Sequence, residues 1–285
     1  MRGRPFKGYA LVARSHSLRF ARRESAAQTA WERRSLISSL SHFALIFAVS
    51  CLASLLSAMS GAGASMLTTP VWLAFGFPLP VAIASNQLNG AAWTLIAARN
   101  YLKGRTVDWR LIRLMVLCGL AGAYAGTLIV RGANPSGLKQ VIGCIILGLA
   151  ALVAFNPTLG QKESPPTLSR GVTGLLALPL GVYEAFFGSG NGLFTSLLLT
   201  KTRGLSLTTA LGCYYVLAFF WNSFAVCIYT SAGLGNASLM IPSTLGSVLG
   251  AYLGSRIGRK KGHRIVRPMF IVLGGVLGLK LALGW

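Results

Sequence analysis

Long apolar runs, separated by short polar or glycine-rich stretches, fill the chain from Leu36 onward. Most are about 20 residues long, the length a helix needs to cross the hydrocarbon of a bilayer. Two runs are clearly shorter. The pattern predicts an all-α, polytopic transmembrane bundle with helices over 36–59, 65–76, 81–102, 110–131, 137–155, 171–187, 191–201, 205–230, 236–257 and 265–284.

These helices fall into two similar halves, 35–155 and 171–285, joined by a polar linker over 156–170. A shift of 128 positions pairs Trp93 with Trp221 and Tyr101 with Tyr229. The same shift aligns the segment Gly-Ala-Tyr-Ala-Gly at 122–126 with Gly-Ala-Tyr-Leu-Gly at 250–254. Matching aromatic residues are hard to obtain by chance, so the sequence predicts an internal duplication.

Positive charge indicates how the halves are oriented, because short loops rich in Lys and Arg stay cytoplasmic. The loop after 81–102 is basic, whereas its counterpart at 231–236 carries no charge. The next pair of loops reverses this, since the basic residues crowd the loop after 236–257. We therefore expect two inverted repeats, the architecture of many secondary transporters.

Residues 1–34 form a basic N-terminal extension without an apolar run, and three interpretations stay open. It is a cytosolic tail, a transit-like segment or the product of a wrongly assigned start codon. Inversion requires an odd number of crossings per half, hence ten in all, which places this basic segment outside. Nine crossings, with one short helix re-entrant, place it inside, and the expected range is eight to ten.

Composition excludes a soluble protein and several other classes. Of the 285 residues, 53% are hydrophobic and only 11% are charged, against about 25% charged in soluble domains. The net charge of +22 lies in loops and termini, which argues against nucleic-acid binding. The five cysteines lie in apolar segments without metal-site or disulfide spacing, and no cofactor motif is present. The chain is predicted not to be an enzyme.

Glycine-rich breaks precede both short helices and are the best candidates for a binding site. They read Met59-Ser-Gly-Ala-Gly-Ala-Ser65 and Phe187-Gly-Ser-Gly-Asn-Gly192. Each break exposes backbone N–H groups at the start of the next half-helix, where the helix dipole favours an anion. Paired breaks at corresponding positions point to a transporter's substrate site, although small residues also serve close helix packing. The predicted donors are Gly61, Gly63, Gly188, Gly190, Asn191 and Gly192.

The chain resembles the TauE/SafE family of sulfite exporters over about residues 40–284. The likeness rests on Gly61-Ala-Gly-Ala-Ser-Met-Leu-Thr-Thr-Pro70, on Gly76-Phe-Pro-Leu-Pro-Val-Ala82, on Gly104-Arg-Thr-Val-Asp-Trp-Arg-Leu-Ile112 and on Gly119-Leu-Ala-Gly-Ala-Tyr-Ala-Gly126. The glycine clusters depart from the family pattern, because Ala64 and Asn191 replace glycines and position 198 is not proline. The resemblance implies a transporter of small sulfur oxyanions or organosulfonates.

Four further side chains are candidates for the transport site, and one for a structural role. Glu184 lies inside an apolar run, where a charge is costly, and is a candidate for proton coupling. The amides of Asn86 and Gln87 and the hydroxyl of Thr68 are candidate donors to an oxyanion, although such residues also bond between helices. Asp108 is expected to cap the helix that starts at Trp109.

These observations predict a multi-pass secondary transporter, an exporter of a small anion such as sulfite, in a bacterial inner membrane. Its partners are the anionic substrate and the bilayer, with a homo-oligomer left open. The rival interpretation is a membrane assembly or chaperone factor that carries nothing. Such a scaffold has no need for symmetrically placed helix breaks.

Overall fold

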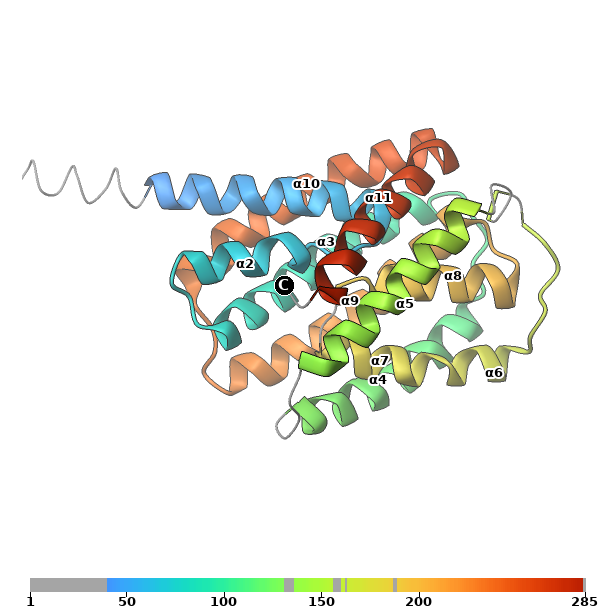
Figure 1. Cartoon of the computed structure of the whole chain (residues 1–285), viewed down its shortest axis with the longest axis horizontal. Coiled ribbons are helices and arrows are strands. Elements are labelled where there is room, and N and C mark those ends of the chain that lie inside the picture. Colours follow the sequence, from blue (N-terminus) through green and yellow to red (C-terminus); the bar gives the residue numbers. More distant parts are fainter. Residues whose placement is uncertain (1–39, 131–135, 156–159, 162, 187–188, 284–285) are drawn as a thin grey trace, which may run out of the picture. The chain divides into compact units, whose positions relative to one another are not determined.

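A computed structural model of the chain describes residues 40–130, 136–155, 160–161, 163–186 and 189–283. Every regular element in these residues is a helix, which confirms the all-α class (Figure 1). The extension 1–34 lies outside the described residues. The helices are Leu40–Ser60, α2 (Ser65–Ala74), α3 (Leu79–Leu102), α4 (Trp109–Val130), α5 (Ser136–Phe155), α6 (Arg170–Leu175), α7 (Ala177–Phe186), α8 (Asn191–Arg203), α9 (Leu207–Ser231), α10 (Ala237–Lys261) and α11 (His263–Ala282).

The helices lie within a few residues of their predicted positions, with one difference. The sequence predicts a single helix over 171–187, but the structure has two, and α6 ends at Leu175. Pro179 explains the break, because it has no N–H to donate to the carbonyl of Leu175 and its ring crowds that carbonyl. The short helices α2 and α8 are both present.

Three of the described helices are long and apolar enough to cross a membrane by the criteria of length and hydropathy. They are Leu40–Ser60, Leu207–Ser231 and Ala237–Lys261. By contrast, the 13 residues of α8 span only about 20 Å, less than the roughly 30 Å of bilayer hydrocarbon. The described helices thus include both helices of spanning length and shorter ones.

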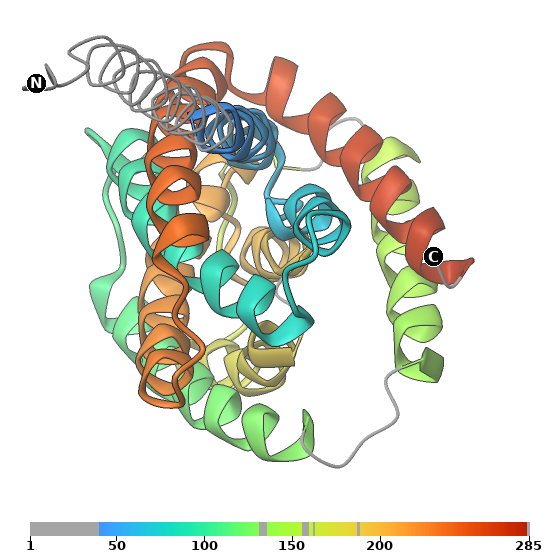
Figure 2. The same cartoon turned by 90° about the vertical axis from the view of Figure 1, so that its left-hand side faces the viewer.

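Helices from different parts of the sequence pack in pairs. Among α2 to α11, the pair α3 and α9 makes the most extensive contact, and α4 packs on α7, α10 on α3 and α5 on α11. Figure 2 looks along the helices and shows α5 and α11 side by side at one flank. The buried ring of Tyr215 on α9 contacts those of Trp93 and Tyr101 on α3, at centroid distances of 5.2 and 5.8 Å.

Both tyrosines also fix the end of the first helix. The hydroxyl of Tyr101 donates to the carbonyl of Ala58 at 2.9 Å, and that of Tyr215 donates to the carbonyl of Ser57 at 2.9 Å. These carbonyls lie one turn before Gly61, where the first helix has ended. The central helices thus determine where the first glycine break lies.

Glycines bring several helix backbones into direct contact. A Cβ atom on Gly122 of α4 would collide with the carbonyl oxygen of Leu178 on α7. The glycine row of α10 packs in the same way on the carbonyls of the first helix: Gly246 on Phe47, Gly250 on Cys51 and Gly254 on Leu55. Gly122 and Gly250 are one of the residue pairs that the 128-residue shift aligns. The duplication and the inversion of the halves stay predictions.

One end of the bundle collects basic residues from both halves. Arg105, after α3, donates to Ser206 before α9 at 3.2 Å, and Arg259 near the end of α10 donates to the carbonyl of Lys103 at 3.2 Å. The same end holds Arg110, Arg113, Arg170, Lys201, Arg203, Arg256, Lys260, Lys261, Arg264 and Arg267. The loops 75–78 and 232–236, at the other ends of α3 and α9, carry no charged residue.

Replacing Gly250 by alanine is expected to destabilise the bundle. Its added Cβ would lie 2.8 Å from the carbonyl carbon of Cys51, and two helix backbones cannot yield as a flexible side chain does. We expect a loss of roughly 1–3 kcal/mol, measured as a lower melting temperature in detergent. Gly275→Ala on α11 is the matched control, because among the described residues no atom of another segment lies within 4 Å of its added Cβ. Equal shifts for both variants would contradict the packing argument.

Candidate functional site

Both glycine breaks depend on backbone conformations that glycine adopts easily and other residues rarely do. Gly61 and Gly63 have φ values of 78° and 86°, and Gly190 has a φ of 86°. These angles lie in the left-handed region, where a Cβ atom is strained. The first helix therefore ends before Gly61, and α8 begins directly after Gly190.

The structure brings the two breaks into contact. The N–H of Gly190 donates to the carbonyl of Ala62 at 2.7 Å. The hydroxyl groups of Ser65 and Ser189 are hydrogen-bonded at 2.5 Å. A Cβ atom on Gly192 would lie 2.5 Å from the carbonyl oxygen of Gly61, so only glycine fits there. Gly188 lies outside the described residues.

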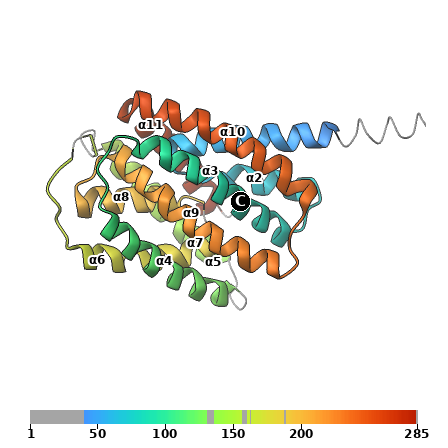
Figure 3. The same cartoon turned by 180° about the vertical axis from the view of Figure 1, so that it is seen from behind.

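Two helices begin at this contact and run away from it in opposite directions, α2 and α8 (Figures 1 and 3). Their N-cap residues, Ala64 and Gly190, provide no side-chain hydrogen bond to the first turn. Each helix N-terminus carries about half a positive charge. Several N–H groups here already have partners: the predicted donors Gly61 and Gly190 donate to the carbonyls of Ser57 and Ala62, and Leu193 donates to that of Gly190. Two such N-termini side by side favour an anion without a basic side chain.

The amide of Asn86 ties α3 to α2. Its Oδ1 accepts from Thr68 Oγ1 at 2.8 Å and from Trp72 Nε1 at 3.1 Å, while its Nδ2 donates to Thr69 Oγ1 at 2.8 Å. Thr68 also donates to the carbonyl of Ala64 at 3.2 Å, which is the back-bonding alternative for this residue. The groups predicted as anion donors here thus hold α2 in place.

Gln87, the next residue on α3, is only 6% exposed. Its Oε1 has no hydrogen-bond partner in the part of the chain that the structure describes. A buried amide oxygen without a partner costs free energy, so such a group favours a nearby donor such as water or a protonated ligand. Of the two amides on α3 that were predicted to bind the anion, Gln87 is the one whose oxygen has no hydrogen-bond partner among the described residues.

Glu184 lies at the centre of a polar cluster formed by α7, α8 and α9. The side chain is 4% exposed. Its Oε2 accepts from Asn191 Nδ2 at 2.5 Å, and its Oε1 accepts from Asn222 Nδ2 at 3.2 Å. Asn191 also donates to the carbonyl of Leu180 at 3.2 Å. Asn191 therefore links Glu184 to the start of α8, and its amide hydrogens are not free for a substrate.

Sequence reasoning did not single out Asn222. The available signal was an amide inside the apolar run Phe219-Phe-Trp-Asn222, directly after a tryptophan that the duplication had marked. A polar side chain at that depth is expected to find a polar partner. Which partner it finds depends on how α9 packs on α7, and that is a tertiary contact.

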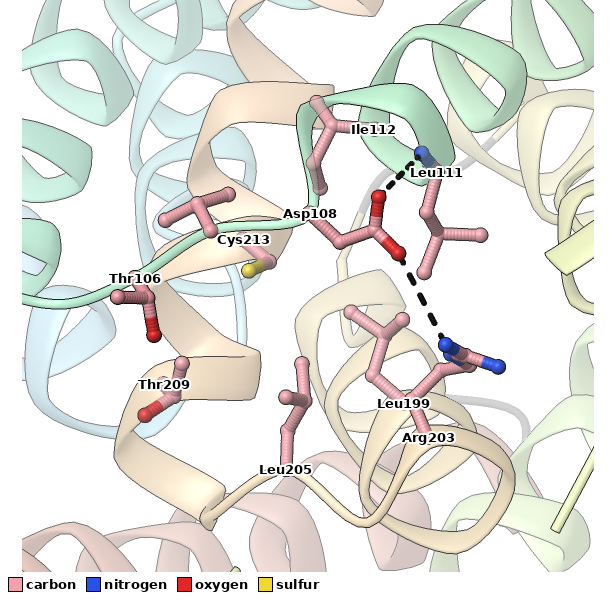
Figure 4. A pocket seen from close by; sticks show the side chains of 10 residues that line it. Thr106, Asp108, Leu111, Ile112, Leu199, Arg203, Leu205, Thr209 and Cys213 are labelled. Carbon is pink, nitrogen blue, oxygen red and sulfur yellow. Dashed lines mark hydrogen bonds and ion pairs between the residues drawn. The ribbon is translucent and has the colours of Figure 1, made fainter. Parts of the chain in front are cut away.

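A second polar cluster lies at the basic end of the bundle, beside a small cavity (Figure 4). Asp108 Oδ1 accepts from the N–H of Leu111 at 3.3 Å, which confirms the predicted cap of α4. Its Oδ2 pairs with Arg170 Nε at 2.6 Å and with Arg203 Nη2 at 3.8 Å. The loop before α4 is thus tied to the start of α6 and to the end of α8.

Opposing effects act on the Asp108 carboxyl. Partial burial raises its pKa, but the hydrogen bond from Arg170, the Leu111 N–H and the charges of Arg170 and Arg203 lower it, and the net effect on the pKa is downward. The carboxylate is therefore stabilised in its charged form in the folded protein.

Comparison with known proteins shows to which family the chain belongs. The family model "Sulfite exporter TauE/SafE" matches residues 46–281, most of the chain. The chain belongs to the TauE/SafE family. It is thus an integral membrane protein of a transporter family, as its apolar helices also indicate.

Relatives with curated names agree with this assignment. The chain is 29% identical over 245 residues to a "Probable membrane transporter protein" of Haemophilus influenzae, covering 85% of this chain and 96% of that protein. It is 24% identical over 238 residues to the "Probable membrane transporter protein YfcA" of Escherichia coli K12, covering 83% and 88%. No solved structure is significantly similar to the chain.

The Asp108 cluster predicts a pH-dependent contribution to stability. Because its folded-state pKa is lowered, the contribution is complete above the unfolded-state pKa of about 3.9 and is lost as the pH falls through the folded-state pKa. Asp108→Asn is expected to cost roughly 0.2–1 kcal/mol at neutral pH, since solvent screens the pair. The measurement is thermal unfolding of both proteins from pH 7 to pH 3, and the difference between the two curves should shrink as the pH falls below the unfolded-state pKa. A constant difference at every pH would refute the electrostatic explanation.

Proposed function

We propose that the protein is a secondary transporter that exports a small anion, a sulfur oxyanion or short organosulfonate such as sulfite. The anion binds where the two glycine breaks meet, at the N-termini of α2 and α8. The single observation that carries the proposal is the hydrogen bond from the Gly190 N–H to the carbonyl of Ala62. It holds the starts of two short helices at one place, from segments far apart in the sequence.

The chemistry of that place suits an anion of small size. Backbone N–H groups and helix dipoles donate to oxyanions without the desolvation cost of a buried lysine or arginine. Discontinuous helices whose N-termini point at an anionic group are a recurring device of secondary transporters. Substrate release is easier from such a site than from a bidentate arginine pair, because no full opposite charge holds the anion.

The basic end of the bundle supports an orientation. Loops rich in Lys and Arg remain on the cytoplasmic side of a membrane. Arg105, Arg203 and Arg259 come from three different helix ends and lie at the same end of the bundle. We assign this end to the cytoplasm, and the uncharged loops 75–78 and 232–236 to the opposite side.

Glu184 is the proposed site of proton coupling. Its carboxyl group is bonded to Asn191, the residue that follows Gly190 at the start of α8. An ionised carboxylate there repels an anion at the breaks, whereas a protonated one does not, because like charges interact strongly in a low dielectric. Protonation of Glu184 is therefore expected to favour anion binding, so that transport depends on the pH of the side to which the site is open.

Reconstituted protein in proteoliposomes is expected to carry labelled sulfite, sulfate or methanesulfonate in a saturable manner. Gly190→Leu should remove the flux, because its φ of 86° resists a side chain and its Cβ would lie 3.0 Å from Ile146 and Leu277. Gly233→Leu is the matched control, since that glycine also has a positive φ, 75°, but its added Cβ meets no atom within 4 Å in the described part of the chain beyond its sequence neighbours. The control should retain at least about half of the flux, a loss below 0.5 kcal/mol.

Absence of flux for all three anions, from protein shown to be folded and inserted, would contradict the proposal. That result would favour the rival interpretation of a membrane assembly factor. Equal flux in the Gly190→Leu and parent proteins would show that the protein transports anions but that the glycine breaks are not the binding site.

Glu184→Gln is expected to keep anion binding but to abolish the dependence of transport on an imposed pH gradient. Glutamine keeps the size and hydrogen-bonding oxygen of the side chain but cannot take up a proton. Flux is measured with and without the gradient, and Glu163→Gln in the exposed linker serves as the control that retains the dependence. An unchanged pH dependence in Glu184→Gln would exclude this residue from coupling.

A further inference from the structure

One face of α8 is unusually polar for a buried helix. Gly192, Ser196 and Thr200 follow one another at intervals of four residues, so they lie on the same face. Ser196 and Thr200 are 0% and 7% exposed. Neither hydroxyl oxygen has a hydrogen-bond partner among the described residues. Five buried serines outside α8, Ser50, Ser54, Ser57, Ser85 and Ser247, also lack a partner among the described residues. What distinguishes Ser196 and Thr200 is that they share a helix face with Gly192 of the second glycine break, where such hydroxyls indicate groups that interact with water or a ligand.

Other hydroxyls of α8 do not share this property. Thr202 donates to the carbonyl of Leu198 at 2.7 Å, and Thr195 donates to Asn191 Oδ1 at 3.4 Å. Both lie off the face defined by Gly192, Ser196 and Thr200. The unpaired hydroxyls are therefore confined to one side of the helix.

This face leads from the glycine breaks to the cavity at the basic end. Leu199 and Arg203 continue the same face and line the cavity, which has a volume of about 60 Å³ (Figure 4). At about 10–15 Å³ per water molecule, it has room for several waters or for one small oxyanion. Cys213 of α9 lines the cavity as well, and its neighbour Tyr214 has its ring against Gly192. Adjacent residues of α9 thus contact the cavity and the second break.

Charged groups of both signs lie at the cavity. Asp108 and Arg203 line it and pair with each other at 3.8 Å, and Arg203 also donates to the carbonyl of Leu168 at 2.6 Å. Arg170 pairs with Asp108 from outside the lining, and Glu163 accepts from the lining residue Thr209 at 3.2 Å. Arg203 is the lining side chain whose charge attracts an anion.

We propose that the cavity and the polar face of α8 form the cytoplasmic half of the transport path. A small oxyanion enters between Arg203 and Cys213 and reaches the glycine breaks past the hydroxyls of Thr200 and Ser196. This inference rests on the proposed function for the direction in which the anion moves. The path itself predicts that positions 196, 200 and 213 are accessible to a water-soluble reagent, which can be measured without transport.

The test uses single cysteines in a variant whose five native cysteines are replaced. Ser196→Cys, Thr200→Cys and a variant that retains only Cys213 are treated with a small, anionic, membrane-impermeant methanethiosulfonate reagent, with and without methanesulfonate. We expect all three thiols to react and methanesulfonate to slow each reaction. Thr202→Cys is the matched control on the same helix, and it should react at least about tenfold more slowly, the factor given by 1.4 kcal/mol, without protection.

The outcomes separate this inference from the proposed function. If the parent protein carries anions but positions 196 and 200 react no faster than 202, the path along α8 is wrong and transport stands. If the parent carries none of the three anions, the proposed function fails. Protection of 196 and 200 by methanesulfonate would then still support an anion-accessible face, and its absence would overturn the path too.

A second pair of variants tests the two hydroxyls without introducing a cysteine side chain. Thr200→Val and Thr202→Val each remove one hydroxyl while keeping the shape of the residue. Thr200→Val should lower flux about tenfold with no loss of melting temperature, because its hydroxyl has no partner in the protein. Thr202→Val should keep the flux. Equal effects of the two substitutions on flux would overturn the role of the polar face.

Discussion

The contact between the two glycine breaks is the constraint on which the rest of the structure depends. The Gly190 N–H bonds to the carbonyl of Ala62, and the backbones of Gly61 and Gly192 touch with no room for a Cβ atom. Such an approach requires helices that stop in the middle of the bundle. Backbone groups freed there must find partners, because lipid offers none. The second break supplies the Gly190 N–H as donor, and the first break supplies the Ala62 carbonyl as acceptor.

The surrounding helices hold this contact in place. Tyr101 and Tyr215 bond to the last carbonyls of the first helix, and Asn86 holds the first turns of α2. Glycines at other interfaces let helix backbones approach directly, as Gly250 does on Cys51. In a bilayer the lipid provides little hydrophobic force between helices, so close packing and interhelical hydrogen bonds must stabilise the bundle. Both kinds of contact converge on the breaks.

The helix α8 connects the two proposed sites, the glycine breaks and the cavity at the basic end. At its start Asn191 bonds to Glu184, and at its end Arg203 pairs with Asp108. A change in the charge of Glu184 therefore acts on the same helix that lines the cavity at the basic end.

The sequence by itself determined the helices, the short half-helices, the glycine breaks and the family. Helix length, apolar runs and glycine-rich breaks are local properties of the chain. A glycine that allows a positive φ can be recognised in the sequence without knowing which residues it contacts. The break at Leu176 was missed although Pro179 marks it, because apolar periodicity continues through it. Only the tertiary structure decided that Asn86 and Asn191 bond to the protein itself, and that Asn222 shares Glu184 with Asn191. Hydrogen-bond partners of a polar side chain in a bundle come from other helices, and their choice depends on how those helices pack.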